Sequence, residues 1–204
     1  MKKTKQRILD ASLDLFNEDG ITEVSLHRIA KSLGMSQGNL NYHFKKKMDI
    51  TEALYHELVL GMNSLFENSP EEGNMLLSFH SKLEDSMRLL YQYRFFLRDI
   101  YKILKDNESL RKHYLSLQEL RKAQVLYFFQ ILQQQGLMKK EAIEGQYERL
   151  FHRMNILSDN WINAYEIQVD KLEDPIKHYR RILFEQIYYY LTEEGQEVFK
   201  QLPH

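Results

Sequence analysis

The residues best suited to bind a partner lie between positions 36 and 47. If Leu40 and Phe44 face inward on a helix that turns about 100° per residue, Gly38 and Tyr42 point directly outward. Asn39, Asn41 and Lys45 flank them. Asn amides can pair with adenine edges, phenol and ammonium groups can reach phosphates, and the first amides of a helix attract anions. This face suits the major groove of DNA; the alternative is an ordinary solvated face on a short helix.

No comparable pattern predicts catalysis or metal binding. The chain has no Cys, which excludes a thiol nucleophile, a disulfide framework and a cysteine-held metal. Its eight His form no HExxH motif and no paired spacing with carboxylates, and no nucleophile elbow is present. His152 and Asn155 form at most a hydrogen-bonding pair inside a helix. We therefore expect no enzyme activity, no cofactor and no metal site.

Three short helices are expected to position the 36–47 segment. The first ends before Gly20, Ser25 is placed to cap the second, Gly34 marks its end, and Ser36 is placed to cap the third. Two short helices joined by a tight turn containing Gly match a helix-turn-helix unit. The apolar positions that have helical spacing are Leu9, Leu13 and Phe16 in the first helix and Leu26, Ile29, Ala30 and Leu33 in the second.

The rest of the chain also reads as helical, so the predicted fold class is all-α. Its 204 residues contain 8 Gly and 3 Pro, and no alternating β-branched run indicates a strand. We expect a three-helix domain over 1–47 and a larger helical bundle over 48–204. The helices expected in the bundle run from 47 to before Pro70 and over about 74–92, 94–106, 108–135, 140–168 and 175–191.

Charge divides the chain in a similar place. Residues 1–50 carry nine Lys/Arg and six Asp/Glu, a net charge of +3, whereas residues 51–204 carry nineteen and twenty-three, a net charge of −4. The first part is therefore the one suited to a polyanion. No apolar run reaches the roughly 18 residues of a membrane span, and Asp10 and Asp14 interrupt any signal peptide. We expect a cytoplasmic protein with no membrane partner.

The ordered run from Thr4 to Ile50 resembles the DNA-binding domain of the TetR (tetracycline-repressor-like, TetR/AcrR-type) family of bacterial regulators. The resemblance covers about a quarter of the chain. It rests on the end of the first helix and the turn at Gly20 that follows it. It also rests on four further segments, which are 24–30 (VSLHRIA), 33–36 (LGMS), 38–44 (GNLNYHF) and 47–50 (KMDI). It implies a cytoplasmic bacterial regulator that binds a double-stranded DNA operator as a homodimer.

The resemblance also implies roles for single residues. Ser36, Gln37, Gly38 and Asn39 match the part of the recognition helix that enters the groove. Tyr42, His43 and Lys47 match positions that meet phosphate, and Ser25 replaces the common Thr that caps the second helix and touches phosphate. His27 and Arg28 are placed to approach the DNA backbone. Asn41 replaces a frequent Tyr, so it either reads a base or is a tolerated variant.

The larger domain of this family binds small molecules, which predicts a small organic effector. Residues from 51 onward hold 22 of the 25 aromatic residues, a density that fits either a ligand cavity or an ordinary core. We expect effector binding to move the helix that begins at Lys47, to change the spacing of two DNA-binding domains and to release the operator. The residues expected to line the cavity are Met62, Phe66, Tyr91, Phe95, Tyr127, Phe128, Met154, Asn155 and Trp161.

The segment 176–191 is apolar nearly all round, which indicates burial on more than one face. The simplest element to pack against the second apolar face is another subunit. A matching apolar stripe on the preceding helix predicts a four-helix dimer interface. The competing hypothesis is a helical ligand-binding or interaction protein without specific DNA binding. The residues predicted for the interface are Leu150, Met154, Leu157, Trp161 and Tyr165, followed by Ile176, Tyr179, Leu183, Ile187 and Tyr190.

Overall fold

The computed structural model describes residues 2–67, 75–168 and 172–203. Helices dominate this part, which contains no strand and one isolated bridge between Met138 and Leu191. The predicted all-α class is confirmed. The helices are α1 (Lys2–Asp19), α2 (Leu26–Ser32), α3 (Gln37–His43), α4 (Lys47–Glu67), α5 (Met75–Gln92), α6 (Arg94–Arg98), α7 (Ile100–Asp106), α8 (Glu108–Gln134), α9 (Gln146–Glu166), α10 (Pro175–Glu185) and α11 (Glu193–Lys200), with a 3-10 turn at Tyr188–Tyr190.

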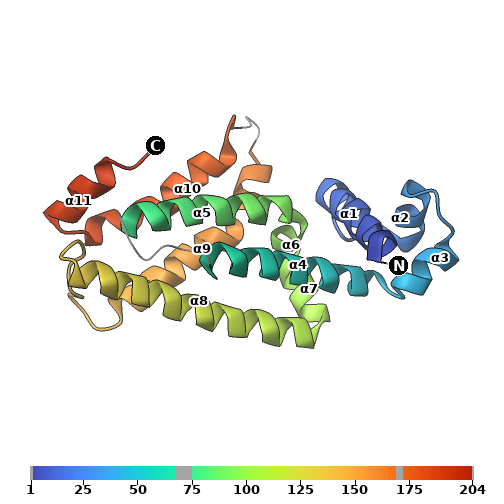
Figure 1. Cartoon of the computed structure of the whole chain (residues 1–204), viewed down its shortest axis with the longest axis horizontal. Coiled ribbons are helices and arrows are strands. Elements are labelled where there is room, and N and C mark those ends of the chain that lie inside the picture. The colour runs from blue at the N-terminus through green and yellow to red at the C-terminus, as the bar shows by residue number, and fades with distance from the viewer. Residues whose placement is uncertain (1, 68–74, 169–171, 204) are drawn as a thin grey trace.

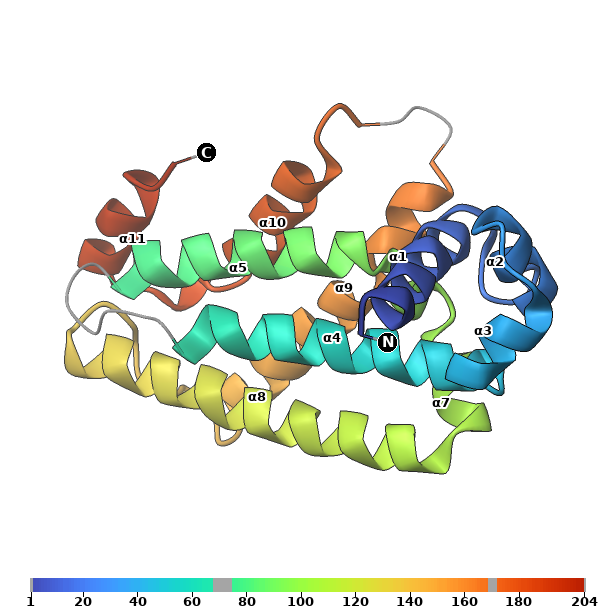
Figure 2. The same cartoon turned by 45° about the vertical axis from the view of Figure 1, so that its right-hand side comes forward.

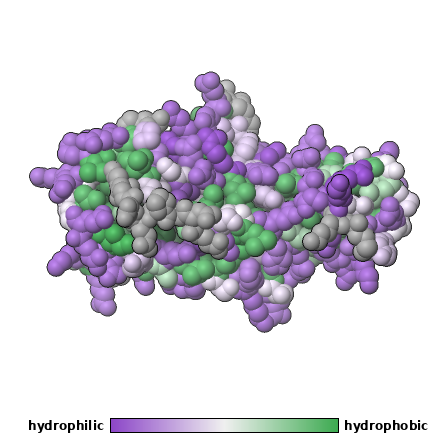
Figure 3. Space-filling view, in the orientation of Figure 1, coloured by the Kyte–Doolittle hydropathy of each residue, from purple (hydrophilic) through white to green (hydrophobic). Residues whose placement is uncertain are grey.

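The molecule is elongated, with α1 to α3 gathered at one end (Figure 1). We call these three helices and their turns, residues 2–46, the head, and the described residues from 47 onward the body. Helices α4, α5 and α8 lie along the length of the body, and α9 and α10 pack against α8 and α5 (Figures 1 and 2). The space-filling view shows the larger apolar patches on the body (Figure 3). No helix among the described residues is long and apolar enough to cross a membrane.

Several helix boundaries differ from those expected. The predicted 94–106 helix is two helices, because the backbone bends at Asp99 (φ −109°, ψ 14°). The predicted 140–168 helix begins at Gln146, because the preceding turn ends at Gly145 in the left-handed region (φ 70°). The predicted 175–191 helix ends at Glu185 and is followed by α11, which was not expected. Thr192 caps α11, and a Cβ at Gly195 would collide with the Leu137 carbonyl, so glycine allows this close approach.

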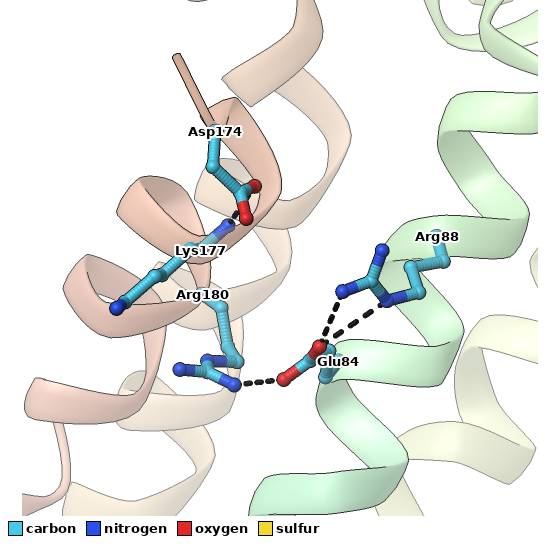
Figure 4. Close-up of polar contacts among 5 residues, drawn as sticks. All are labelled: Glu84, Arg88, Asp174, Lys177 and Arg180. Atoms are coloured by element: carbon cyan, nitrogen blue, oxygen red, sulfur yellow. Dashed lines mark hydrogen bonds and ion pairs between the residues drawn. The ribbon is translucent and has the colours of Figure 1, made fainter. Parts of the chain in front are cut away.

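An ion-pair cluster holds α10 on α5. Glu84 of α5 accepts hydrogen bonds from Arg88, one turn along the same helix, and from Arg180 of α10, whose side chain is buried (Figure 4). Asp174 caps the start of α10 by accepting from the backbone N–H of Lys177 at 2.9 Å. Since one carboxylate serves two guanidinium groups, α10 is fixed relative to the middle of α5.

Candidate DNA-binding face and ligand cavity

Helix α3 presents polar side chains to solvent, as its sequence predicts. Ser36 caps the helix by accepting from the backbone N–H of Asn39 at 3.2 Å, and Leu40 and Phe44 are buried beneath it. Tyr42 is 72% exposed, and its ring meets that of His43 edge-on with centroids 5.3 Å apart. The remaining predicted groove residues, Gln37, Gly38, Asn39 and Asn41, are also exposed. All of them lie on the one free surface of a seven-residue helix.

Helix α2 supports α3 and is tied to α1. Ser25 caps α2 by accepting from the backbone N–H of Arg28 at 3.2 Å, which confirms its predicted capping role. Arg28 also forms an ion pair with Asp19 at the end of α1, with Nη2 and Oδ2 2.6 Å apart. His27 is exposed beside it. The Arg28 guanidinium therefore links α2 to the end of α1 at the surface of the head.

Lys47 has a structural partner that the sequence did not suggest. Its ammonium group at the start of α4 donates to the carbonyl oxygens of Ile21, Thr22 and Val24, at 3.3 Å for Thr22 and 2.8 Å for Val24. Burial, followed by the nearby charge of Lys102, lowers the pKa of this group. In this conformation Lys47 holds the turn between α1 and α2, so its predicted phosphate contact stays a prediction.

A large, partly open cavity lies between the helices of the body. Its volume is about 770 Å³, and residues of α4, α5, α6, α8, α9 and α10 line it. This size falls within the usual range for small-molecule sites, and most of the wall is apolar. The predicted lining residues that lie on the wall are Met62, Phe66, Tyr127, Phe128, Met154 and Asn155.

Three of the residues predicted to line the cavity, Tyr91, Phe95 and Trp161, do not lie on its wall. Trp161 is fully buried, with ring centroids 5.9 Å from Tyr91 and 5.6 Å from Tyr179. Tyr91 therefore covers Trp161 and does not reach the cavity wall. Phe95 is fully buried against Phe16 of α1, with centroids 5.4 Å apart. Aromatic density marked these positions, but it cannot separate packing between helices from the wall of a cavity.

Polar residues that the sequence analysis missed also line the cavity. Asp159 accepts hydrogen bonds from the Tyr114 hydroxyl at 3.0 Å and from Asn155 Nδ2 at 3.2 Å, and burial raises the pKa of its carboxyl. The Tyr55 hydroxyl lies 2.9 Å from His113 Nδ1, and burial raises the pKa of Tyr55 to about 12. A usable signal was present, because Asp159 follows Asn155 by one helical turn, a spacing at which an amide and a carboxylate can hydrogen-bond.

One short helix joins the head to the cavity. Phe96 and Leu97 of α6 line the cavity, whereas their neighbours Phe95 and Arg98 contact α1. The contact centres on Asn17, a buried residue of α1 that the sequence analysis also missed. Asn17 donates to the Gln92 carbonyl at 2.7 Å and accepts from the Phe95 N–H at 3.0 Å. Arg98 in turn donates to the Asn17 carbonyl at 2.8 Å and pairs with Glu166 of α9 at 2.9 Å.

The predicted dimer stripe lies mostly inside the body, which corrects that prediction. The side chains packed within the chain are Leu150, Met154, Trp161, Tyr179, Leu183 and Ile187, and the half-buried ones are Leu157, Tyr165, Ile176 and Tyr190. The apolar faces of α10 are covered by the chain itself, because α10 packs against α5 and α9, and Phe199 of α11 stacks on Phe184 with centroids 4.9 Å apart. The apolar side chains that α9 and α10 turn outward are Ile156, 65% exposed, and Ile182, 39% exposed.

The described residues contain no group of three or more side chains of His, Asp or Glu placed to hold a metal ion. The two candidate sites are a polar helix face at one end of the molecule and a mostly apolar cavity in the body.

Comparisons with known proteins match both parts. Residues 8–54 match the family described as bacterial regulatory proteins of the tetR family, and residues 58–199 match TetR, described as a bacterial transcriptional repressor. The chain is 24% identical over 147 residues to the probable HTH-type transcriptional regulator YttP of Bacillus subtilis, covering 69% of this chain and 68% of that protein. It is 45% identical over 49 residues to the HTH-type transcriptional regulator SAUSA300_2515 of Staphylococcus aureus, covering 24% and 26%.

Solved structures share the architecture over nearly the whole chain. A TetR-family transcriptional regulator from Marinobacter aquaeolei has a TM-score of 0.79 at 25% identity, covering 98% of this chain and 99% of that one. A transcriptional regulator from Saccharomonospora viridis in complex with choline has a TM-score of 0.74 at 20% identity, covering 95% and 100%. Since one family model alone spans more than half of the sequence, the chain belongs to the TetR family of bacterial transcriptional regulators.

Proposed function

We propose that this chain is a ligand-responsive transcriptional repressor. Two copies bind a palindromic operator through α3, and a small organic molecule in the body cavity weakens that binding. We divide the chain functionally at Lys47, with DNA recognition over 1–47 and effector binding and dimerisation over 48–204. The observation that carries the proposal is the position of α6, whose neighbouring residues contact the cavity on one side and the head on the other.

The exposed face of α3 suits direct reading of DNA. Gln37, Asn39 and Asn41 carry amides that can pair with base edges, and Gly38 leaves room for close approach. The groups proposed to meet the phosphate backbone are those of Ser25, His27, Arg28, Ser36, Tyr42 and His43. Lys47 contributes by holding the turn that positions α2.

Dimerisation sets the distance between the two heads. Helix-turn-helix dimers bind half-sites about 34 Å apart, so a change in head spacing lowers affinity. We place the interface on the outward faces of α9 and α10, where Ile156 and Ile182 are exposed. Sedimentation of an Ile156→Glu/Ile182→Glu variant should show monomers. Leu115→Glu, at an exposed position of α8, should remain a dimer, and an unchanged dimer in the double variant would move the interface elsewhere.

Effector coupling follows from the contacts of α6. A molecule that displaces Phe96 or Leu97 changes the position of Phe95 and Arg98, and through Asn17 that of α1. A coupling of about 1 to 3 kcal/mol, or roughly 5- to 150-fold in affinity, is sufficient for such a response. The choline held by the Saccharomonospora viridis regulator supports a small-molecule effector for this architecture.

Fluorescence anisotropy with a labelled promoter fragment and a random duplex tests DNA recognition. The chain should bind the promoter more tightly, and an Asn41→Ala/Tyr42→Ala variant should lose about 1 to 3 kcal/mol of binding free energy per contact without losing stability, because both side chains are exposed. Tyr101→Ala removes an equally exposed tyrosine of α7 and should leave binding unchanged. Equal, weak and salt-sensitive binding to both duplexes would leave only non-specific electrostatics, as the competing non-DNA-binding hypothesis requires.

A further inference from the structure

The cavity holds one carboxylate among the residues described on its wall, that of Asp159 in the middle of α9. Both hydrogen bonds to it, from Tyr114 and Asn155, end on Oδ2. The described part of the chain provides no hydrogen bond to Oδ1. A buried carboxylate is costly unless hydrogen bonds or an opposite charge compensate it. Asp159 therefore has one oxygen compensated by the protein and one left for whatever occupies the cavity.

Aromatic rings adjoin this carboxylate. Tyr114 bonds to it directly, the Phe96 ring centroid lies 6.4 Å from that of Tyr114, and the Tyr55 centroid lies 5.1 Å from that of Phe96. All three residues line the cavity. The Tyr55 hydroxyl is already bonded to His113, so Tyr55 offers its ring. Aromatic rings next to a carboxylate attract organic cations, because the ring faces carry negative charge density.

The cations on the wall belong to a different part of the cavity. Arg121 follows Tyr114 by seven residues on α8, which places it about 10 Å further along the helix. Its guanidinium donates to Asn63 Oδ1 at 2.7 Å and to Gln124 Oε1 at 2.8 Å, and it lies 4.7 Å from the Phe66 ring centroid. Lys82 lies over the same ring at 5.7 Å. These two charges thus gather around Phe66, away from Asp159 and its aromatic neighbours.

We propose that the effector carries an organic ammonium group, which binds Asp159 Oδ1 beside the rings of Tyr55, Phe96 and Tyr114. The apolar remainder of the molecule lies along the wall toward Met62 and Phe128. This assignment rests on the proposed function of the cavity as the effector site, and it specifies the chemical class of the effector.

Calorimetric titration of the full chain with three matched probes tests the assignment. The probes are octyltrimethylammonium, octan-1-ol and octanoate, which share an eight-carbon chain and differ in the charge of the head. The ammonium should bind about tenfold more tightly than the alcohol, because the Asp159 carboxylate compensates its charge, and octanoate should bind more weakly than the alcohol, because the same carboxylate repels it. In Asp159→Asn the ammonium and the alcohol should bind within about twofold of each other, while the affinity for the alcohol is unchanged.

Asp85→Asn is the matched control, because Asp85 is an exposed residue of α5 outside the cavity and the substitution removes the same charge. It should keep the full preference for the ammonium. A preference for octanoate, or an ammonium preference that survives Asp159→Asn, overturns the assignment. Binding of the alcohol without any ammonium preference also overturns it, yet leaves the cavity as an effector site. The proposed repressor function is judged separately, by operator binding in the absence of probes.

Discussion

The head and the body differ in whether their buried side-chain polar atoms have hydrogen-bond partners. In the head, Ser12 donates to the Ile8 carbonyl at 2.6 Å, and Asn17 uses both its amide nitrogen and its amide oxygen. The buried side-chain atoms without a hydrogen-bond partner in the described residues are Ser86 Oγ, Arg98 Nε, Trp161 Nε1 and Arg180 Nε, and all four belong to the body.

This difference suggests where the molecule can change shape. A region whose buried polar atoms are paired has one favoured arrangement, whereas unpaired buried atoms and a large cavity are costs that a ligand or a rearrangement can relieve. We infer that the head moves as a rigid unit while the body adapts. A regulator built in this way alters the position of its DNA-binding face and keeps the shape of that face intact.

The largest expected effect comes from breaking the contact between the two regions. Phe16→Ala removes the ring that packs against Phe95, where both side chains are fully buried, and should cost about 3 to 5 kcal/mol of unfolding free energy. Phe66→Ala removes the same atoms from the cavity wall, where the ring is half-buried, and should cost much less. Urea unfolding of both variants measures the difference. Equal losses of unfolding free energy would contradict the expectation that the contact between head and body is closely packed while the cavity wall is loosely packed.

The second largest expected effect is that of Lys47→Met, which distinguishes a structural role of Lys47 from a direct contact with DNA. Lys47→Met removes the ammonium that serves three carbonyls and should destabilise the head by about 2 kcal/mol, because hydrogen bonds from charged groups contribute about 1.5 to 3 kcal/mol. Lys45→Met, at an exposed position after α3, should leave stability unchanged. Hydrogen exchange of the turn 21–24 measures the effect directly. Normal protection in Lys47→Met, together with weakened DNA binding, would assign the residue to phosphate contact.

The head could be predicted in detail because its signals are local. Ser25 and Ser36 precede short helices and cap them, and the spacing of Leu40 and Phe44 fixed which side of α3 is exposed. The structural role of Lys47 was not predicted, because its acceptors lie more than twenty positions away, in a turn whose path depends on tertiary packing.

The body could be predicted only as a set of helices. Trp161 and Met154 share one apolar stripe, yet one is enclosed by Tyr91 and Tyr179 while the other lines the cavity. Helical periodicity gives the buried direction of a residue but not the neighbour that covers it. The same limit explains the dimer prediction, since α5 and α9 of the same chain cover α10 and Phe199 of α11 stacks on its Phe184.

The third prediction compares helix caps in the two regions. Ser36→Ala should destabilise the head by about 1 kcal/mol and weaken operator binding, because α3 has only seven residues and its cap supplies one of few fixed hydrogen bonds. Thr192→Ala removes the corresponding cap of α11 together with a hydrogen bond to the Gly136 carbonyl, and it should reduce stability at least as much without affecting operator binding. Ser81→Ala, at an exposed position within α5, should be neutral or slightly stabilising. Weakened operator binding in Thr192→Ala would show that the body transmits local changes to the head even without an effector.

The smallest expected effect is a pH dependence of body stability that originates at Asp159. Burial raises the pKa of this carboxyl above its ordinary value of 3.8, so the folded state holds the proton more firmly than the unfolded chain does. Stability from this group is then fully present at pH values below 3.8 and decreases as the pH rises through the folded-state pKa. Asp159→Asn should therefore gain stability relative to the unchanged chain as the pH rises from 4 toward 7. Thermal unfolding across this range measures it. A relative stability that falls with pH would mean that Tyr114 and Asn155 compensate the charge fully, which would leave no electrostatic demand for a cation in the cavity.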